Sequence, residues 1–93
     1  MTLQMIVKKT KPVLRRYNIK QAFVFGSYAR GEQKKNSDFD LLIDPPKGMS
    51  LFDLLDLEQN LRDKLGVDVD VVTRRSVHPL LKPHIKKDQI KIL

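Results

Sequence analysis

Two aspartates, Asp38 and Asp40, stand two residues apart at the start of the apolar run 41–43. Side chains two residues apart on a strand leave the same face, so both carboxylates would point the same way. Two such carboxylates repel each other unless a cation lies between them, and hard oxygen ligands suit Mg²⁺ or Mn²⁺. The pair therefore predicts a divalent-metal site with Asp38 and Asp40 as ligands.

A glycine and a serine, Gly26 and Ser27, directly follow the apolar run 22–25. A glycine at the end of a buried strand lets the backbone turn tightly and approach a ligand closely. A helix that begins at Ser27 would direct free N–H groups outward, and the Ser27 hydroxyl would add a donor. We therefore expect Gly26 and Ser27 to bind phosphate, with Arg30 one turn further on to contact a phosphate oxygen.

A third carboxylate would complete a two-metal site, in which one ion activates the attacking oxygen and the other stabilises the leaving phosphate. The segment 67–72 offers Asp68 and Asp70, which share one face of a strand while its valines occupy the other. On geometry alone, either Asp68 or Asp70 could be the third carboxylate. A phosphate-binding turn after one strand and carboxylates on the next predict metal-assisted transfer on a nucleotide.

Two other motifs begin in the same region, and both fail at a required position. Gly26 opens a spacing like that of a P-loop, but Glu32 stands where that motif requires lysine. A calcium-binding loop that starts at Asn36 fails at Leu41, where glycine is obligatory.

The elements that must position these residues alternate between strands and helices. Apolar or alternating runs bounded by turn residues predict strands over 22–25, 38–43 and 67–72, and the stretch 26–37 predicts a turn, a short helix and a loop. We expect an α/β (α+β) fold: residues 1–93 form one domain, a small mixed β-sheet of three to four strands covered by helices.

Three longer helices are expected around this sheet. Residues 2–17 form the first, which Pro12 kinks or which restarts after Thr10. Ser50 and Asp53 resemble a capping box at the start of a helix over 51–65, whose leucines we assign to the core. The last helix covers residues 76–87.

The composition narrows the classes of partner and compartment. The chain has 93 residues, a net charge of +7 and no cysteine. Without cysteine there is no disulfide framework and no thiolate zinc site, which suits the cytoplasm. No apolar run approaches the ~18 residues that cross a bilayer, so no membrane association is expected. The charge favours nucleotides, nucleic acid or an acidic protein face, but the few aromatic residues form no RNA-binding pattern, so nucleic acid is not favoured.

Residues 25–43 closely resemble the signature of the minimal nucleotidyltransferases, the MntA-like antitoxins of the DNA polymerase beta-like nucleotidyltransferase superfamily. The family pattern is Gly-Ser, a spacer, and Asp-x-Asp on a strand; here ten residues, Tyr28 to Ser37, form the spacer. The family's third carboxylate lies in a Val-Asp-hydrophobic-Val stretch that residues 69–72 match. The resemblance therefore favours Asp70 over Asp68.

The resemblance implies an enzyme that binds two magnesium ions, with manganese as the alternative, and moves AMP from ATP to an acceptor hydroxyl. It also implies an antitoxin whose acceptor is a partner toxin of the all-helical HEPN class. Larger relatives carry an acceptor-binding domain, so here the acceptor would be held by the partner or by a second copy of the chain. The alternative is a binding module that neutralises its partner by occlusion, with vestigial catalysis.

Overall fold

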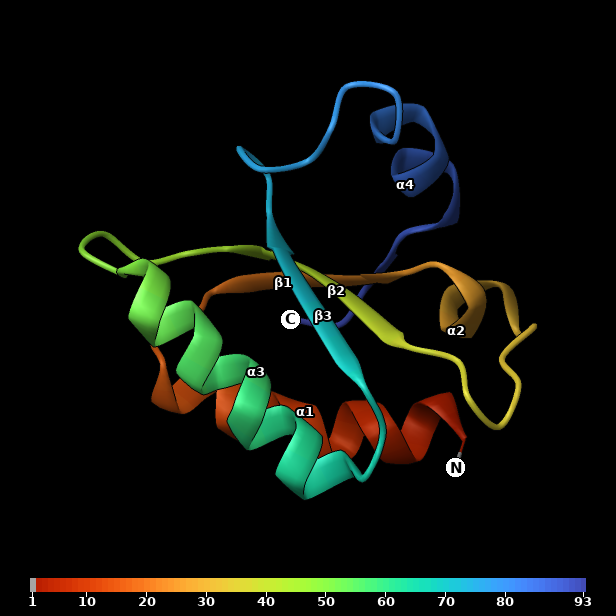
Figure 1. The fold of residues 1–93 in the computed structure, drawn as a ribbon, viewed down its shortest axis with the longest axis horizontal. Helices are drawn as coiled ribbons and strands as arrows, with labels where there is room; N and C mark the ends of the chain where they lie inside the picture. The colour runs from red at the N-terminus through yellow and green to blue at the C-terminus, as the bar shows by residue number, and fades with distance from the viewer. Residues whose placement is uncertain (1) are drawn as a thin grey trace.

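The computed structural model describes residues 2–93 and arranges them as helices and strands that alternate along the chain (Figure 1). Within this range the elements are α1 (Leu3–Arg16), β1 (Gln21–Phe25), α2 (Ser27–Arg30), β2 (Phe39–Asp44), α3 (Leu51–Leu65), β3 (Val69–Thr73), α4 (Lys82–Asp88) and β4 (Ile90–Lys91). None of the helices in the described range is long and apolar enough to span a membrane.

The strands form one mixed sheet in the order β3-β2-β1-β4. β1 pairs antiparallel with both β2 and β4, whereas β2 and β3 run parallel. In Figure 1, α1 and α3 lie side by side against one face of the sheet, and α4 lies on the other side. The expected mixed sheet of three to four strands covered by helices is thus confirmed.

The core lies between the sheet and the pair α1 and α3. Along β2, Phe39, Leu41 and Ile43 are fully buried and belong to this core, because alternate side chains of a strand leave the same face. Asp40 lies on the opposite face and is half-buried. Leu42 also points to that face, yet only 3% of it is exposed. A burial this complete means that both faces of β2 are covered.

The first helix is continuous through Pro12, so the expected restart after Thr10 is wrong, whereas a kink at Pro12 stays a prediction. Thr2 caps α1 by accepting a hydrogen bond from the Met5 backbone at 3.2 Å. Thr10 is buried inside the helix and donates its hydroxyl to the carbonyl of Ile6 at 2.7 Å. Pro12 removes one backbone donor, but both it and Lys8, whose carbonyl loses a partner, are exposed, so water can replace the lost bond.

The helix over 51–65 has the expected bounds, and its capping box is present. Ser50 accepts from the Asp53 backbone at 3.2 Å, and the Asp53 carboxylate accepts from the Ser50 backbone at 2.9 Å. The assignment of all its leucines to the core is wrong, because Leu51 and Leu55 are 67% and 51% exposed. Neither lies on the stripe of residues four apart that faces the sheet, which consists of Leu57, Leu61 and Leu65.

Other boundaries also differ from those expected. β2 begins one residue later and includes Asp44, while β3 begins at Val69 instead of residue 67. α4 begins at Lys82 instead of residue 76, because residues 73–76 close a turn in which the Ser76 hydroxyl donates to the Thr73 carbonyl at 3.0 Å. Pro83 occupies the first turn of α4, where a missing N–H costs nothing. β4 was not predicted, and at two residues it carries no periodic signal.

Candidate active site

Asp40 and Asp70 lie next to each other on neighbouring strands. Their Cα atoms are direct partners in the parallel pair β2 and β3, so both side chains leave the sheet face opposite α1 and α3. Asp40 is half-buried and Asp70 is exposed. Asp38 precedes β2 and is exposed. The expectation that it shares a strand with Asp40 is therefore wrong.

Burial and neighbouring negative charges raise the pKa of Asp40 from 3.8 to about 6. Burial is the largest cause, followed by the charges of Asp70 and Asp38, whereas the Arg30 guanidinium lowers the pKa. The three carboxylates therefore lie within electrostatic reach of one another, with Asp40 at the centre. A cation beside Asp40 would relieve this repulsion.

Gly26 makes room for the Asp40 carboxylate. Its backbone has φ 75° and ψ −154°, a conformation that is almost restricted to glycine. A Cβ at this position would lie 2.3 Å from Asp40 Oδ2, far inside the contact distance. The sequence predicted Gly26 from the close approach of a ligand; the structure adds a second reason, which is the approach of a side chain from the next strand.

The short helix α2 follows this glycine and is anchored by Tyr28. The Tyr28 ring is buried and meets Phe39 of β2 edge-on, with 5.6 Å between the ring centroids. This contact fixes the position of Ser27 at the start of α2. The N–H groups of Ala29 and Arg30 donate to the Gly26 carbonyl, so within α2 those of Ser27 and Tyr28 remain for an acceptor outside the helix.

Arg30 has protein partners in this structure. Its Nη1 lies 2.8 Å from Asp88 of α4, and its Nε lies 3.2 Å from Glu32. The two carboxylates raise the pKa of the guanidinium through these hydrogen bonds. Arg30 thus links α2 to α4, and its contact with a phosphate stays a prediction.

The structure separates Asp68 from the other aspartates. Its backbone carbonyl accepts from the Phe39 N–H at 2.8 Å, and its side chain lines a different depression together with Lys35 and Arg62. Asp68 is also absent from the charges that raise the pKa of Asp40. Of the two aspartates that the sequence left open, Asp70 is the one that lies beside Asp40.

The carboxylates around Asp40 suit a hard cation that takes its remaining ligands from water and substrate. In residues 2–93 no three His, Cys, Asp or Glu side chains come close enough together to enclose a metal ion. Mg²⁺, however, is often held by only one or two carboxylates, with water and substrate phosphates as its other ligands. A half-buried carboxylate between two further acidic residues fits that mode of binding.

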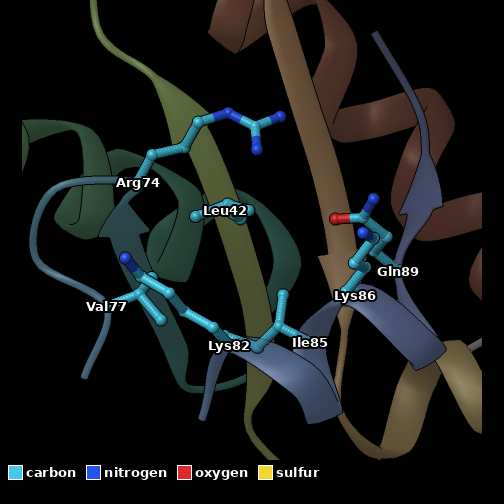
Figure 2. A pocket seen from close by; sticks show the side chains of 7 residues that line it. All are labelled: Leu42, Arg74, Val77, Lys82, Ile85, Lys86 and Gln89. Carbon is cyan, nitrogen blue, oxygen red and sulfur yellow. The ribbon is translucent and has the colours of Figure 1, made fainter. Parts of the chain in front are cut away.

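A cavity of about 410 Å³ lies on the same sheet face as Asp40, between β2 and α4 (Figure 2). Its floor is Leu42, and basic side chains from the end of β3 and from α4 line it. In the structure Arg74 binds Asp44, with 2.7 Å between Nε and Oδ1. The lysines of α4 gave no sequence signal, because they resemble a solvated basic surface.

The model of the nucleotidyltransferase domain family matches residues 7–92. The chain is 44% identical over 93 residues to a candidate protein adenylyltransferase of Methanocaldococcus jannaschii, with 100% of both chains covered. A solved structure of a candidate minimal nucleotidyltransferase superposes with a TM-score of 0.82 at 34% identity, covering 97% of this chain and 95% of the other. A crystal structure of a toxin–antitoxin complex with AMP-PNP gives a TM-score of 0.82 at 27% identity, covering 94% of this chain and 72% of that one.

The matched range, residues 7–92, spans all four strands and therefore the segments that carry the candidate site. The relatives and the solved structures agree with it over nearly the whole chain. The resemblance that residues 25–43 suggested is therefore confirmed, and the chain belongs to the nucleotidyltransferase domain family, in its minimal form.

Proposed function

We propose that this protein transfers AMP from ATP to a hydroxyl group of a partner protein, and that the partner is a toxin of the HEPN class. The register of Asp40 with Asp70 carries the proposal, because it places two carboxylates side by side on the sheet face opposite α1 and α3. The candidate protein adenylyltransferase supports AMP as the transferred group, and the toxin–antitoxin complex with AMP-PNP supports both ATP and an antitoxin role.

Each residue of the site has a distinct role in this proposal. Gly26 and Ser27 bind the β- and γ-phosphates, whereas Asp38 and Asp40 would hold two magnesium ions. Asp70 would complete the ligands on the acceptor side. Magnesium, when bound, supplies positive charge that lowers the pKa of the acceptor hydroxyl and stabilises charge on the phosphates.

The reaction is an in-line displacement at the α-phosphorus. The acceptor oxygen forms a bond to that phosphorus as the bond to the β-phosphate breaks, and pyrophosphate leaves. α2 holds the leaving pyrophosphate through Ser27 and the first N–H groups of the helix. Asp40, at the centre of the carboxylates, would lie beside the transferred group, and Arg30 of α2 would contact a phosphate oxygen.

Labelled ATP tests the proposal in a lysate of the native host or with the purified partner. We expect label from the α-phosphate, but not from the γ-phosphate, to appear on one protein when magnesium is present. Asp40→Asn and Asp70→Asn should abolish the transfer, whereas Asp68→Asn, the matched control, should retain it. Activity that survives both of the first two substitutions would contradict the assignment. Neutralisation of the toxin without any labelling, unchanged by Asp38→Asn and Asp40→Asn, would instead establish occlusion.

A further inference from the structure

A groove of about 650 Å³ lies between α1 and β4, and part of its lining is apolar. The apolar residues are Leu3, Val7, Ile90 and Ile92. Ile92 belongs to the core between the sheet and α1, whereas Ile90 is 38% exposed. The groove therefore lies on the sheet face that α1 covers, opposite the face of Asp40. Exposed apolar surface of this kind is typical of a place where another molecule binds.

Four cationic side chains line the same groove: Lys8, Lys11, Arg15 and Lys91. In residues 2–93 none of the four lies within ion-pairing distance of a carboxylate, and α1 itself contains no acidic residue. Like charges in one groove repel one another, and an anionic partner relieves that repulsion. The lining has no aromatic ring on which a base could stack, so an acidic protein segment fits it better than single-stranded nucleic acid.

β4 presents a free sheet edge beside this groove. As far as the structure describes the chain, the sheet ends at β4, which has β1 on one side and no strand on the other. Ile92 donates its N–H to the Ala22 carbonyl of β1 at 2.9 Å. Consecutive residues of a strand direct their backbone groups to opposite edges, so those of Lys91 point away from β1. A further strand can pair with them.

The α1 wall of the groove offers a hydrogen-bond acceptor of its own. Pro12 has no N–H, so the Lys8 carbonyl lacks its helical donor, and both residues line the groove. From Leu3 to Arg15 this wall is about 18 Å long, since a helix rises about 1.5 Å per residue. An extended chain covers that distance with about five or six residues. The groove thus has the length of a short strand.

We propose that this groove binds an extended acidic segment of a partner protein, which joins the sheet as a strand beside β4. Its backbone pairs with Lys91, its apolar side chains contact Leu3 and Val7, and its carboxylates pair with the four cations. The positive charge selects an acidic partner, and the free edge selects an extended one. Because the groove and Asp40 lie on opposite faces of the sheet, this binding does not depend on the proposed transfer of AMP.

A blocked peptide of six residues, in which glutamate and valine alternate, tests the groove without any need for turnover. It is titrated into the protein at low salt and followed by NMR chemical shifts. We expect the shifts to gather on α1 and β4. The double substitution Lys8→Glu and Lys11→Glu should raise the dissociation constant of the peptide at least tenfold. Lys9→Glu with Arg16→Glu is the matched control, since both are exposed residues of α1 that do not line the groove.

The extended form of the bound segment has a test of its own. Two versions of the peptide carry methyl groups on alternate backbone nitrogens, so that each version has one edge blocked. Only one edge of an added strand faces β4, so one version should lose its affinity and the other should keep it. Equal affinities of the two versions would overturn strand addition.

Other results would overturn the groove as a site for an acidic segment. An absence of shifts on α1 and β4, or an equal effect of the control substitutions, would show at most general attraction by a basic helix. Equal binding of a peptide with serine in place of valine would show that the apolar lining has no role. Tighter binding of a single-stranded oligonucleotide at the same residues would show a nucleic-acid site.

Sedimentation and nucleotide binding separate the remaining alternatives. A dimer of the protein alone that the Lys8→Glu and Lys11→Glu variant abolishes would show that a second copy occupies the groove, against the proposal. A non-hydrolysable ATP analogue with magnesium should bind the wild type and this variant equally. If the analogue does not bind the wild type, the proposed function fails, whereas the peptide titration still decides the groove.

Discussion

Replacement of Asp40 by asparagine should make the protein more stable above pH 6 while it abolishes activity. The fold raises the pKa of Asp40 from 3.8 to about 6, so the native state binds this proton more tightly than the unfolded chain does. Stability therefore falls as the pH rises between about 4 and 6, and the whole penalty is present above pH 6. Asparagine carries no charge at any of these pH values and escapes the penalty.

The size of the effect follows from the shift and from the exposure of the side chain. Each factor of ten in proton affinity corresponds to about 1.4 kcal/mol, so the change from 3.8 to about 6 corresponds to about 3 kcal/mol. Asp40 is only half-buried, and solvent screening reduces this to about 1.5 kcal/mol. In a domain of this size such a gain raises Tm by roughly 6–12 °C.

Urea unfolding followed by circular dichroism, in EDTA at pH 4 and pH 8, measures this difference. Asp40→Asn and the wild type should have similar stability at pH 4 and differ by about 1.5 kcal/mol at pH 8. Asp68→Asn, an exposed aspartate outside the cluster, should show no such dependence on pH. Added magnesium should stabilise the wild type at pH 8 and leave Asp40→Asn unchanged, because a ligand stabilises only the state that binds it. A gain that is equal at both pH values, or a loss at pH 8, would refute the reasoning.

Three further substitutions test contacts that hold the fold together. Gly26→Ala should lower the free energy of unfolding by about 3 kcal/mol or more and abolish transfer, because its Cβ meets the Asp40 carboxylate. The control Gly66→Ala, at a similar positive φ with open space around it, should lower the free energy of unfolding by only about 1 kcal/mol in the same urea experiment. Glu58→Ala should lower the free energy of unfolding by about 2–3 kcal/mol, because it removes a buried carboxylate that accepts a β3 backbone N–H at 2.8 Å. Amide hydrogen exchange should then become faster in β3. Unchanged protection of these amides would contradict this role of Glu58. Ser50→Ala should cost about 1 kcal/mol by thermal unfolding, with activity retained.

Much of the fold followed from local patterns. The alternation of Phe39, Leu41 and Ile43 with Asp40 predicted which face of β2 is buried, because a strand has a period of two. The capping box at Ser50 predicted the start of α3, since its two hydrogen bonds lie within four residues. Signals of this kind are contained in short segments and do not depend on the rest of the chain.

The rest depends on contacts between segments that are distant in sequence. Parity predicts that Asp68 and Asp70 share a face, and the family resemblance favoured Asp70. The register of β3 against β2 shows that Asp70 is the one that adjoins Asp40. The Asp40 side chain fills the space at Gly26, which no local pattern reveals. The start of α4 was misplaced, because residues 73–76 satisfy their hydrogen bonds in a turn instead of a helix.

The close approach of Gly26 and Asp40 makes the two positions interdependent in evolution. The space that a side chain at residue 26 would need is filled by the carboxylate of residue 40, so the effect of a substitution at one position depends on the residue at the other. A lineage that loses the carboxylate removes the steric contact but keeps the strain of a positive φ, so a side chain at residue 26 becomes less costly without becoming free of cost. A residue that enters position 26 in such a lineage would then block the return of the aspartate, and loss of the acid would become hard to reverse.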